Sequence, residues 1–186
     1  MAELEPRWLA WSRELLAIAQ SGLAFTQDPY DRQRYEALRG IAAQILGAQA
    51  DGDPQRIVEL FSGEEGYATP KLEVRAAVFD PRGRILMVRE VADGWTLPGG
   101  WADVNLSPAE NAEKEAFEES GYRVRARKLA AAWDRVRQGH PPGLFACAKL
   151  FFVCELLGGE AATSLETAEV AWFARDALPP DLSTGR

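Results

Sequence analysis

LPGGWADVNLSPAENAEKEAFEESGY, residues 97–122, is the stretch that decides the fold of this chain. It predicts a tight glycine turn, a short loop and one helix. Ser107 is a suitable N-cap, Pro108 suits the first helical position, and Glu110 completes a capping box with Ser107. Gly121 is placed to end the helix in a left-handed conformation.

The predicted helix has two contrasting sides. Its apolar side, formed by Ala109, Ala112, Ala116 and Phe117, can pack on a sheet. Its other side carries Glu115, Glu118 and Glu119, which are neighbours because residues three and four apart meet on a helix. Their repulsion costs about 0.2–0.5 kcal/mol per pair, and the helix dipole disfavours anions near the C-terminus. The ordinary interpretation is a solvated acidic face. The two penalties favour another, in which the carboxylates bind a hard divalent cation, magnesium or manganese.

The same stretch resembles the Nudix box, G-x5-E-x7-R-E-U-x-E-E-x-G-U, in which U is a bulky apolar residue. The positions that match are Gly100, Glu115, Glu118, Glu119, Gly121 and Tyr122. Three positions depart: Leu106 stands where the family has glutamate, Lys114 where it has arginine, and Ala116 is small for U. The family's glutamate and arginine are charged partners, so we interpret the first two changes as coupled and expect Lys114 to need no such partner. Leu106 is then expected to pack as an apolar staple beside the helix.

The resemblance extends over nearly the whole chain. The helical leader, PKLEVRAAVFD (70–80) and KLFFVCELLGGE (149–160) are similar to bacterial Nudix hydrolases with a helical N-terminal domain. That subgroup includes CDP-choline pyrophosphatases and ADP-ribose pyrophosphatases. The resemblance implies an α/β fold, the Nudix α/β/α sandwich with a mixed sheet, preceded by a small helical domain. We therefore expect a helical domain over 1–62 and a Nudix hydrolase domain over 67–186.

Hydrophobic periodicity supplies the remaining elements. Three helices are expected before Phe61, the first ending near Gly22 and the others starting at Asp28-Pro29 and Asp53-Pro54. Strands are expected over 72–78 and 85–88 as a hairpin, then over 95–97, 124–136, 145–157 and 170–173. The strand over 145–157 reads as buried on both faces. A short last helix is expected over 175–178.

Composition limits the functional classes. The net charge of -7 argues against binding to duplex nucleic acid or to an anionic membrane. No apolar run reaches the roughly 18 residues of a membrane span, and no signal-peptide pattern opens the chain. Cys147 and Cys154 are expected on opposite faces of one strand, which makes a disulfide between them unfavourable and suits free thiols in the cytoplasm.

Hydrolysis of a pyrophosphate needs charge neutralised on oxygen and a water made nucleophilic, and a bound divalent metal can supply both. Glu115 and Glu119 are the first expected metal ligands, with Glu118 third. By family analogy the Gly99 carbonyl is a fourth ligand and the general base comes from a loop near the last strand, where Glu166 is the candidate and Glu169 the fallback. The predicted catalytic residues are thus Glu118, Glu119 and Glu166.

Substrate contacts are predicted with less support from the pattern. The candidates to hold phosphates are Arg75, Arg89, Arg135 and Lys149, although each alone reads more simply as a surface charge. His140, the only histidine, lies in a proline loop. A structural or substrate-gating role is the simpler interpretation, and contact with a base or a phosphate of the substrate is the alternative. Trp101 and Trp133 are able to stack on a nucleobase, but core packing is the simpler interpretation for both.

Two classes of function follow. The first is a hydrolase that cleaves a nucleoside diphosphate linked to another group into a nucleoside monophosphate and a phosphorylated group, with CDP-choline, ADP-ribose and RNA ends as competing substrates. The second is a Nudix-fold sensor that binds such a ligand without cleaving it. The three retained carboxylates favour the hydrolase. About 60 leading residues cannot bury their apolar stripes alone, so we also expect a homodimer formed through the N-terminal helices.

Overall fold

The computed structural model describes residues 5–50, 53–141 and 143–184. The chain divides into two units, one made of residues 1–70 with 142–146 and the other of residues 71–141 with 147–186. Each unit has its own core and is described by itself. No helix in the described ranges is both long enough and apolar enough to cross a bilayer.

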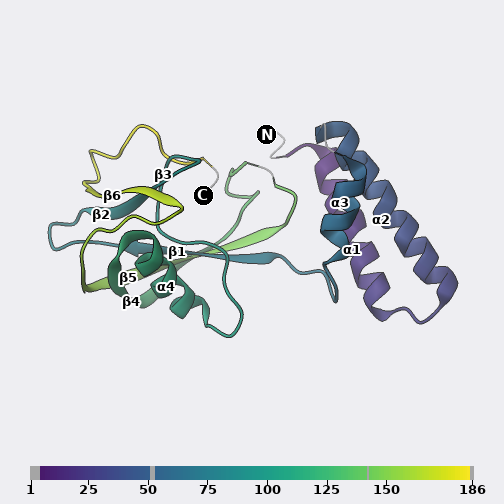
Figure 1. The fold of residues 1–186 in the computed structure, drawn as a ribbon, viewed down its shortest axis with the longest axis horizontal. Coiled ribbons are helices and arrows are strands. Elements are labelled where there is room, and N and C mark those ends of the chain that lie inside the picture. Colours follow the sequence, from purple (N-terminus) through teal and green to yellow (C-terminus); the bar gives the residue numbers. More distant parts are fainter. Residues whose placement is uncertain (1–4, 51–52, 142, 185–186) are drawn as a thin grey trace. The chain divides into compact units, whose positions relative to one another are not determined.

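The first unit is helical. It contains α1 (Arg7–Phe25), α2 (Pro29–Ala50) and α3 (Pro54–Ser62) (Figure 1). The Asp28 carboxylate accepts hydrogen bonds from the backbone N–H groups at the start of α2, and Asp53 caps α3 in the same way. The predicted starts of these two helices are therefore confirmed, and the physical reason is the capping of otherwise unpaired N–H groups.

The core of the helical unit joins all three helices. Its buried members are Leu9, Leu16, Ala42, Leu46 and Phe61. The Phe145 ring lies 5.2 Å from the Phe61 ring, so a residue expected to begin a strand instead completes this core. The strand starts two residues later.

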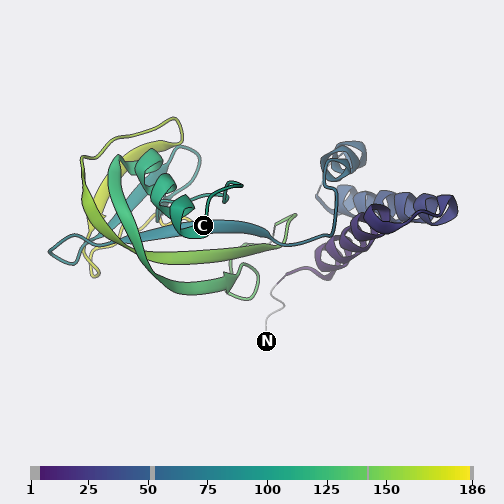
Figure 2. The ribbon, with the colours of Figure 1, turned by 90° about the horizontal axis from the view of Figure 1, so that it is seen from below.

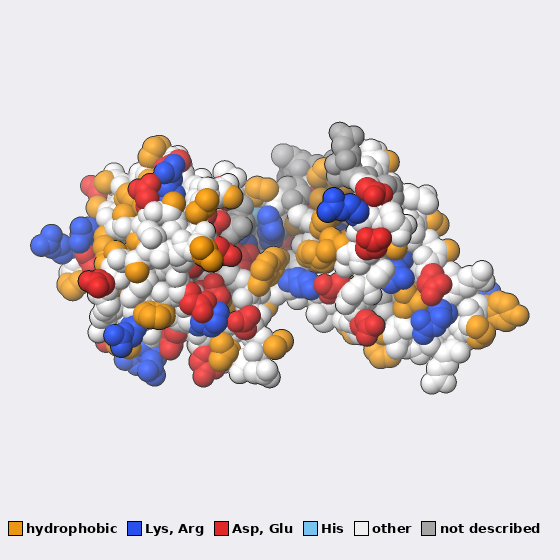
Figure 3. Space-filling view, in the orientation of Figure 1, with side chains coloured by type: hydrophobic (Ala, Val, Ile, Leu, Met, Phe, Trp, Pro, Cys, Tyr) orange, Lys and Arg blue, Asp and Glu red, His pale blue; other side chains and the backbone are white. Residues whose placement is uncertain are grey.

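A second apolar stripe of α1 stays outside that core. Trp11, Ile18 and Phe25 follow one another at seven-residue spacing and are 57%, 48% and 71% exposed. Residues seven apart lie on one side of a helix. Figure 3 shows exposed apolar side chains on the surface of the helical unit. The helical unit therefore buries one side of α1 and presents another apolar side to its surroundings.

The second unit contains two three-stranded sheets and one helix within the described residues. The first sheet has the order β1 (Lys71–Val78), β5 (Cys147–Gly159), β4 (Tyr122–Asp134), with β1 and β5 parallel and β4 antiparallel to β5. The second has the antiparallel order β3 (Trp95–Thr96), β2 (Ile85–Glu90), β6 (Thr167–Phe173). Helix α4 (Pro108–Ser120) lies along the first sheet (Figures 1 and 2). The mixed sheet preceded by helices confirms the predicted fold class.

The core of this unit lies between α4 and the sheets. Val74, Ala76 and Val78 alternate on one face of β1 and meet Ala112 and Ala116 of α4. These alanines let the helix approach the sheet closely, as the period of the sequence predicted. Glu73 and Arg75 consequently share the opposite face of β1.

Three expectations about the secondary structure of this unit are wrong. Strands β1 and β2 do not pair as a hairpin and lie in different sheets. The free edge of β1 pairs instead with the segment 98–102. The N–H of Ala76 donates to the Pro98 carbonyl oxygen and the N–H of Val74 to that of Gly100, both at 2.9 Å. Residues 175–178 form a turn and not a helix. The end of β5 is exposed at Glu155 and Leu157, so this strand is not buried on both faces. Cys147 and Cys154 are free and buried, as predicted.

Candidate active site

Helix α4 is built as its sequence predicts. The Ser107 hydroxyl accepts from the N–H of Glu110, and the Glu110 carboxylate accepts from the N–H of Ser107, so both halves of the capping box are present. Gly121 ends the helix with a positive φ of 76°. The caps fix where the helix begins and ends, and therefore where its three glutamates lie.

These glutamates line one cavity. Glu115, Glu118 and Glu119 of α4 face Ser164, Leu165 and Glu166 from the segment before β6, around a space of about 380 Å³. Figure 3 shows acidic side chains gathered around the region of α4. We call this space the acidic cavity. The structure therefore brings the predicted ligands and the predicted base, which lie far apart in sequence, to one place.

Glu119 is the most enclosed of the three. It is 7% exposed, and its Oε2 accepts a hydrogen bond of 2.8 Å from the N–H of Gly99. Burial raises its pKa to about 7; the Gly99 N–H and Arg75 oppose this rise, while Glu115 and Glu90 add to it. Burial also raises the pKa of Glu115. A divalent cation bound between two such carboxyl groups would lower their raised pKa values and favour their charged forms.

The glycine turn supports this arrangement sterically. Gly99 has a φ of 147°, and a Cβ there would lie 2.0 Å from the Val74 carbonyl oxygen. A Cβ at Gly100 would lie 2.8 Å from a carboxylate oxygen of Glu115. At Gly99, whose Cβ would meet backbone, only glycine lets the turn pass beside β1. The recorded contact of Gly99 with the site is through its N–H, and the role of its carbonyl as a metal ligand stays a prediction.

Lys114 has more partners than the sequence suggested. Its ammonium nitrogen lies 2.6 Å from Glu118, 3.2 Å from Asp103 and 3.6 Å from Glu115. The hydrogen bond to Glu118 raises its pKa above the usual value. Asp103 from the preceding loop therefore gives Lys114 an acidic partner that the sequence did not suggest. That Lys114 needs no glutamate at position 106 stays a prediction.

The side chain of Leu106 does not provide the expected staple. It is 40% exposed and lies outside the core of the unit. The loop is held instead by Asn111, a buried residue of α4 that the sequence analysis did not single out. Its Oδ1 accepts a hydrogen bond of 2.9 Å from the backbone N–H of Asp103, and its Nδ2 donates one of 3.1 Å to the backbone carbonyl oxygen of Asp103. The sequence did carry a signal for this role, because a polar asparagine stands among the alanines on the buried side of the helix.

As arranged, the carboxylates do not converge on one point. Among the described residues no group of three or more histidine, cysteine, aspartate or glutamate side chains is close enough together to hold a metal ion. The contacts give the reason, since Glu118 is drawn to Lys114 and Glu119 to the Gly99 N–H. The donors are all oxygen atoms, which a hard cation prefers, and Lys114 bonds to one carboxylate oxygen of Glu118.

Arg89 and Glu169 are placed together and away from the acidic cavity. They face each other across β2 and β6, with a 2.8 Å ion pair, and Arg89 also lies 3.4 Å from Asp181. Neither residue lines the acidic cavity. Glu166, by contrast, does line it, with its backbone held by the Ser164 hydroxyl.

Arg75 and Lys149 are not surface charges. They are 1% and 0% exposed, and both lie against Glu73, which is 5% exposed. Arg75 donates from Nε and Nη2 to Glu73 and from Nη1 to the Leu97 carbonyl oxygen. Burial alone would raise the pKa of Glu73, but Arg75 and Lys149 outweigh burial and lower it. Glu73 was missed, although its spacing of two from Arg75 places opposite charges on one strand face.

A second cavity of about 190 Å³ lies beside this buried group. Its walls are Arg75, Met87, Trp95, Thr96, Leu97, Trp133, His140, Phe151, Leu182 and Ser183. We call it the aromatic cavity.

Trp133 is 39% exposed and Trp101 is 53% exposed. Core packing is therefore the wrong interpretation for both tryptophans. Strand registration explains why Trp133 reaches this place, because it pairs with Lys149 on β5.

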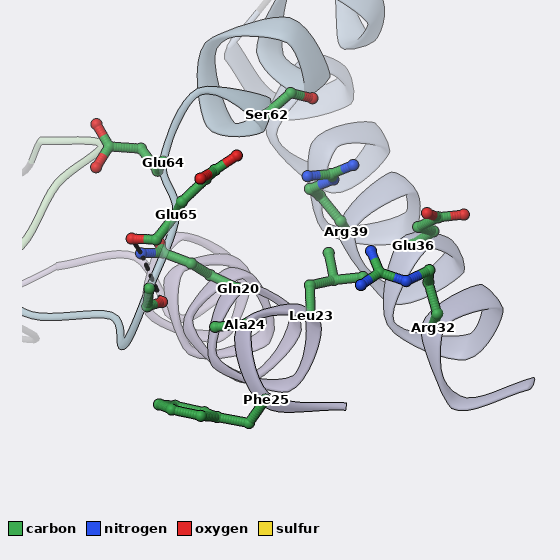
Figure 4. A pocket seen from close by; sticks show the side chains of 11 residues that line it. Gln20, Leu23, Ala24, Phe25, Arg32, Glu36, Arg39, Ser62, Glu64 and Glu65 are labelled. Carbon is green, nitrogen blue, oxygen red and sulfur yellow. Dashed lines mark hydrogen bonds between the residues drawn. The ribbon is translucent and has the colours of Figure 1, made fainter. Parts of the chain in front are cut away.

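The helical unit has an open cleft of its own. It measures about 450 Å³ and is lined by both arginine and glutamate side chains, among them Arg32, Glu36 and Arg39 of α2 (Figure 4). On its opposite side Gln20 donates to the carbonyl oxygens of Glu65 and Gly66, each at 3.3 Å. Charges of both signs along α2 alternate without converging, which is typical of a solvated polar surface.

Two regions of the chain match known family models. Residues 6–61 match the family model described as a UDP-X-like, N-terminal oligomerisation domain, and residues 69–186 match the model of the NUDIX domain. A putative ADP-ribose pyrophosphatase, YjhB, of Bacillus subtilis (strain 168) is 43% identical over 181 residues, which are 97% of this chain and 86% of that protein.

Solved structures agree with these matches. The crystal structure of a UDP-X diphosphatase is 36% identical, with a TM-score of 0.58, over 96% of this chain and 86% of that one. An ADP-ribose pyrophosphatase from Streptococcus suis is 42% identical, with a TM-score of 0.54, over 60% of this chain and 79% of that one.

Proposed function

The chain belongs to the Nudix family and is a Nudix pyrophosphohydrolase, as its motif predicted. We propose on this basis that it hydrolyses the pyrophosphate of a nucleoside diphosphate linked to a second group. The products are a nucleoside monophosphate and the phosphorylated second group. The observation that carries the proposal is the acidic cavity, in which three glutamates of α4 meet Glu166. The names of the relatives favour substrates of the ADP-ribose and UDP-X type. CDP-choline remains a proposed member of the same class.

We assign metal binding to Glu115, Glu118 and Glu119, with the Gly99 carbonyl as a fourth donor and magnesium or manganese as the ion. When bound, such an ion neutralises charge on the pyrophosphate oxygens and makes a water more acidic. The protein's own contribution is to hold Glu119 through the Gly99 N–H and to offer Lys114 as a counter-charge that can release Glu118.

Glu166 is the proposed general base. It lines the acidic cavity from the side opposite α4, and its side chain is exposed to the solvent that supplies the attacking water. A base must lie within hydrogen-bond reach of the water it activates. Glu169 is less suitable because Arg89 holds it in an ion pair outside the cavity.

The substrate contacts are proposals of unequal support. Arg89, on the surface, is able to meet a phosphate if it exchanges its carboxylate partners. Arg75 and Lys149 are buried with Glu73, so we propose that they act on a phosphate through the positive field of this group. His140 lines the aromatic cavity and not the acidic one.

We also propose a homodimer formed through the N-terminal helices. The matched family model is described as an oligomerisation domain. The stripe of Trp11, Ile18 and Phe25 on α1 gives a second copy an apolar surface to cover. Light scattering of the full chain at micromolar concentration should give twice the monomer mass, and Ile18→Glu should shift it to monomer. A parent chain that is monomeric under these conditions would remove this part of the proposal.

The two buried thiols fit a reducing compartment, and we propose the cytoplasm. An RNA-end hydrolase and a non-hydrolysing sensor are the alternative functions. The sensor reading is disfavoured by the retention of all three glutamates.

The test of the proposed function is a substrate panel. Purified full-length protein is incubated with magnesium or manganese and with ADP-ribose, UDP-sugars, CDP-choline and a 5′-triphosphorylated RNA. Hydrolysis of a nucleoside diphosphate derivative that stops with excess chelator supports the proposal. Cleavage of RNA ends alone, tight binding without turnover, or full turnover in chelator would each contradict it.

A further inference from the structure

The aromatic cavity is formed by residues from both sheets of the second unit. Trp133 of β4 lies 4.7 Å from the ring of Phe151 and 6.1 Å from the ring of His140. Met87 and Trp95 of the second sheet contribute apolar walls. The result is a slot of about 190 Å³ with aromatic walls, in which the Trp133 ring is tilted by 56° to Phe151 and by 47° to His140. A planar heteroaromatic ring can contact such walls.

One polar atom of a residue that lines this slot lacks a hydrogen-bond partner. His140 Nε2 is buried, and the described residues offer it no hydrogen bond. Burial lowers the pKa of His140, so its imidazole is neutral at pH 7 and has one donor and one acceptor nitrogen. A buried polar atom without a partner is unfavourable, and a ligand edge that bonds to it removes that penalty.

The slot is also close to the acidic cavity. Leu97 lines the slot, and its carbonyl oxygen accepts a 2.8 Å hydrogen bond from Arg75. Gly99, two residues further along, donates to Glu119 of the acidic cavity. Two residues of chain span at most about 7 Å. The wall of the slot therefore continues directly into the turn that holds Glu119, as a ligand whose ring and phosphates are joined by one sugar requires.

We propose that the aromatic cavity binds the nucleobase of the substrate, with Trp133 stacking on the ring and His140 Nε2 hydrogen-bonding to its edge. This assignment rests on the proposed function and adds the part of the substrate that the motif does not describe. Trp133 supplies affinity for any base because every base has a π-face. His140 supplies discrimination, because its single nitrogen bonds well only to bases with a complementary edge group.

Binding of nucleoside monophosphates to the metal-free full chain tests the cavity without turnover. The probes are UMP, CMP, AMP and GMP in excess chelator, with ribose 5-phosphate as the ligand that lacks a base. We expect Trp133→Ala to raise the dissociation constant for the preferred nucleotide roughly 5- to 100-fold. We expect His140→Ala to reduce the preference among the four bases.

The matched control is Phe79→Ala, which removes an aromatic side chain that is 47% exposed and lies outside the cavity. Its dissociation constants should equal those of the parent. Trp133→Phe and His140→Gln serve if an alanine variant fails to fold, which circular dichroism and the unfolding midpoint report. Trp133→Phe should weaken binding less than the alanine change, and His140→Gln should alter base preference.

Two results overturn the proposal: the parent binds ribose 5-phosphate as tightly as any nucleotide, or the Trp133 and His140 variants bind all four nucleotides as the parent does. The proposed function fails separately, when the parent hydrolyses no substrate with metal present. If the parent is active, the KM for its substrate should rise in Trp133→Ala. An active enzyme whose KM is unchanged in both folded variants overturns the assignment of the cavity alone.

Discussion

Glu73 and Glu119 are buried to nearly the same degree, at 5% and 7% exposure, but their pKa values move in opposite directions. Glu73 lies between Arg75 and Lys149, and these two cations outweigh the effect of burial. Glu119 has other carboxylates as neighbours and one backbone N–H as its main support. Partners, more than burial, decide whether an interior carboxylate is stabilising or poised to take a cation.

The largest expected effect is on folding, from Glu73→Gln. It leaves Arg75 and Lys149 buried without their carboxylate, and breaking a buried ion pair by removing one partner costs about 3–5 kcal/mol. The free energy of unfolding, measured in urea at pH 7, should fall by this amount.

Glu155→Gln is the matched control for Glu73→Gln. Glu155 is a glutamate of the same sheet whose pair with Arg127 is exposed, and such pairs contribute about 0–1 kcal/mol. Equal losses of stability in the two variants would contradict the structural role of the buried group.

The next effect is on catalysis, from Glu119→Gln. We expect kcat/KM to fall at least about 100-fold, or 2.7 kcal/mol of barrier, because the change removes a charge at the metal site and little volume. In chelator the same variant should be as stable as the parent or more stable, since the buried charge is gone. Glu155→Gln, an exposed glutamate outside the acidic cavity, is the control and should keep its rate. A fully active Glu119→Gln would contradict the assignment of this residue.

The contrast between the two glutamates also marks what the sequence could predict. The cluster of α4 was predictable because its spacing, caps and glycines are local, and one helix fixes all of them. The Glu73 group was not predicted, since it depends on the parallel registration of β1 with β5, which brings Lys149 opposite Glu73. Alternation along β1 did indicate that Glu73 and Arg75 share a face. It could not show that another strand would bury them.

The same limit explains the other misses. The turn at Asp80 predicted a hairpin, and local contacts such as Arg84 to Asp80 do form. The edge of β1 nevertheless pairs with residues 98–102 and not with β2. No short-range pattern in the sequence shows which of these two segments pairs with β1. Likewise the aromatic cavity joins residues from five strands and from three segments outside them, so Trp133 and His140 gave no signal as a pair.

The change of stability with pH should be smaller than the effects of these substitutions. Glu73 and Glu119 should contribute to it with opposite signs. The pKa of Glu119 is raised to about 7 in the folded protein from an ordinary 4.5, so the folded state retains a proton that the unfolded state has lost. This contribution to stability is full below about pH 4.5 and is lost as the pH rises through 7. Glu73 behaves in the opposite way, and its contribution is lost only in acid.

Metal-free parent should therefore lose about 1–2 kcal/mol between pH 5.5 and 8, relative to Glu119→Gln. Unfolding in urea with chelator, for both proteins at several pH values, measures the difference. Subtraction of the variant removes the contributions of other groups, including His140. A difference that stays flat over this range would show that Glu119 is ionised throughout.

The smallest expected effect is from Leu106→Glu, which restores the acid of the family motif. Lys114 already has Asp103 as a partner outside α4, so a further carboxylate in the loop has little left to neutralise. Leu106 is 40% exposed, and the added charge should also cost little stability. We expect kcat/KM to change by less than tenfold, which corresponds to about 1.4 kcal/mol. Val104→Glu, in the same loop and 84% exposed, controls for added negative charge. A gain of tenfold or more in Leu106→Glu alone would mean that the natural chain lacks a catalytic group, and that Asp103 does not replace it.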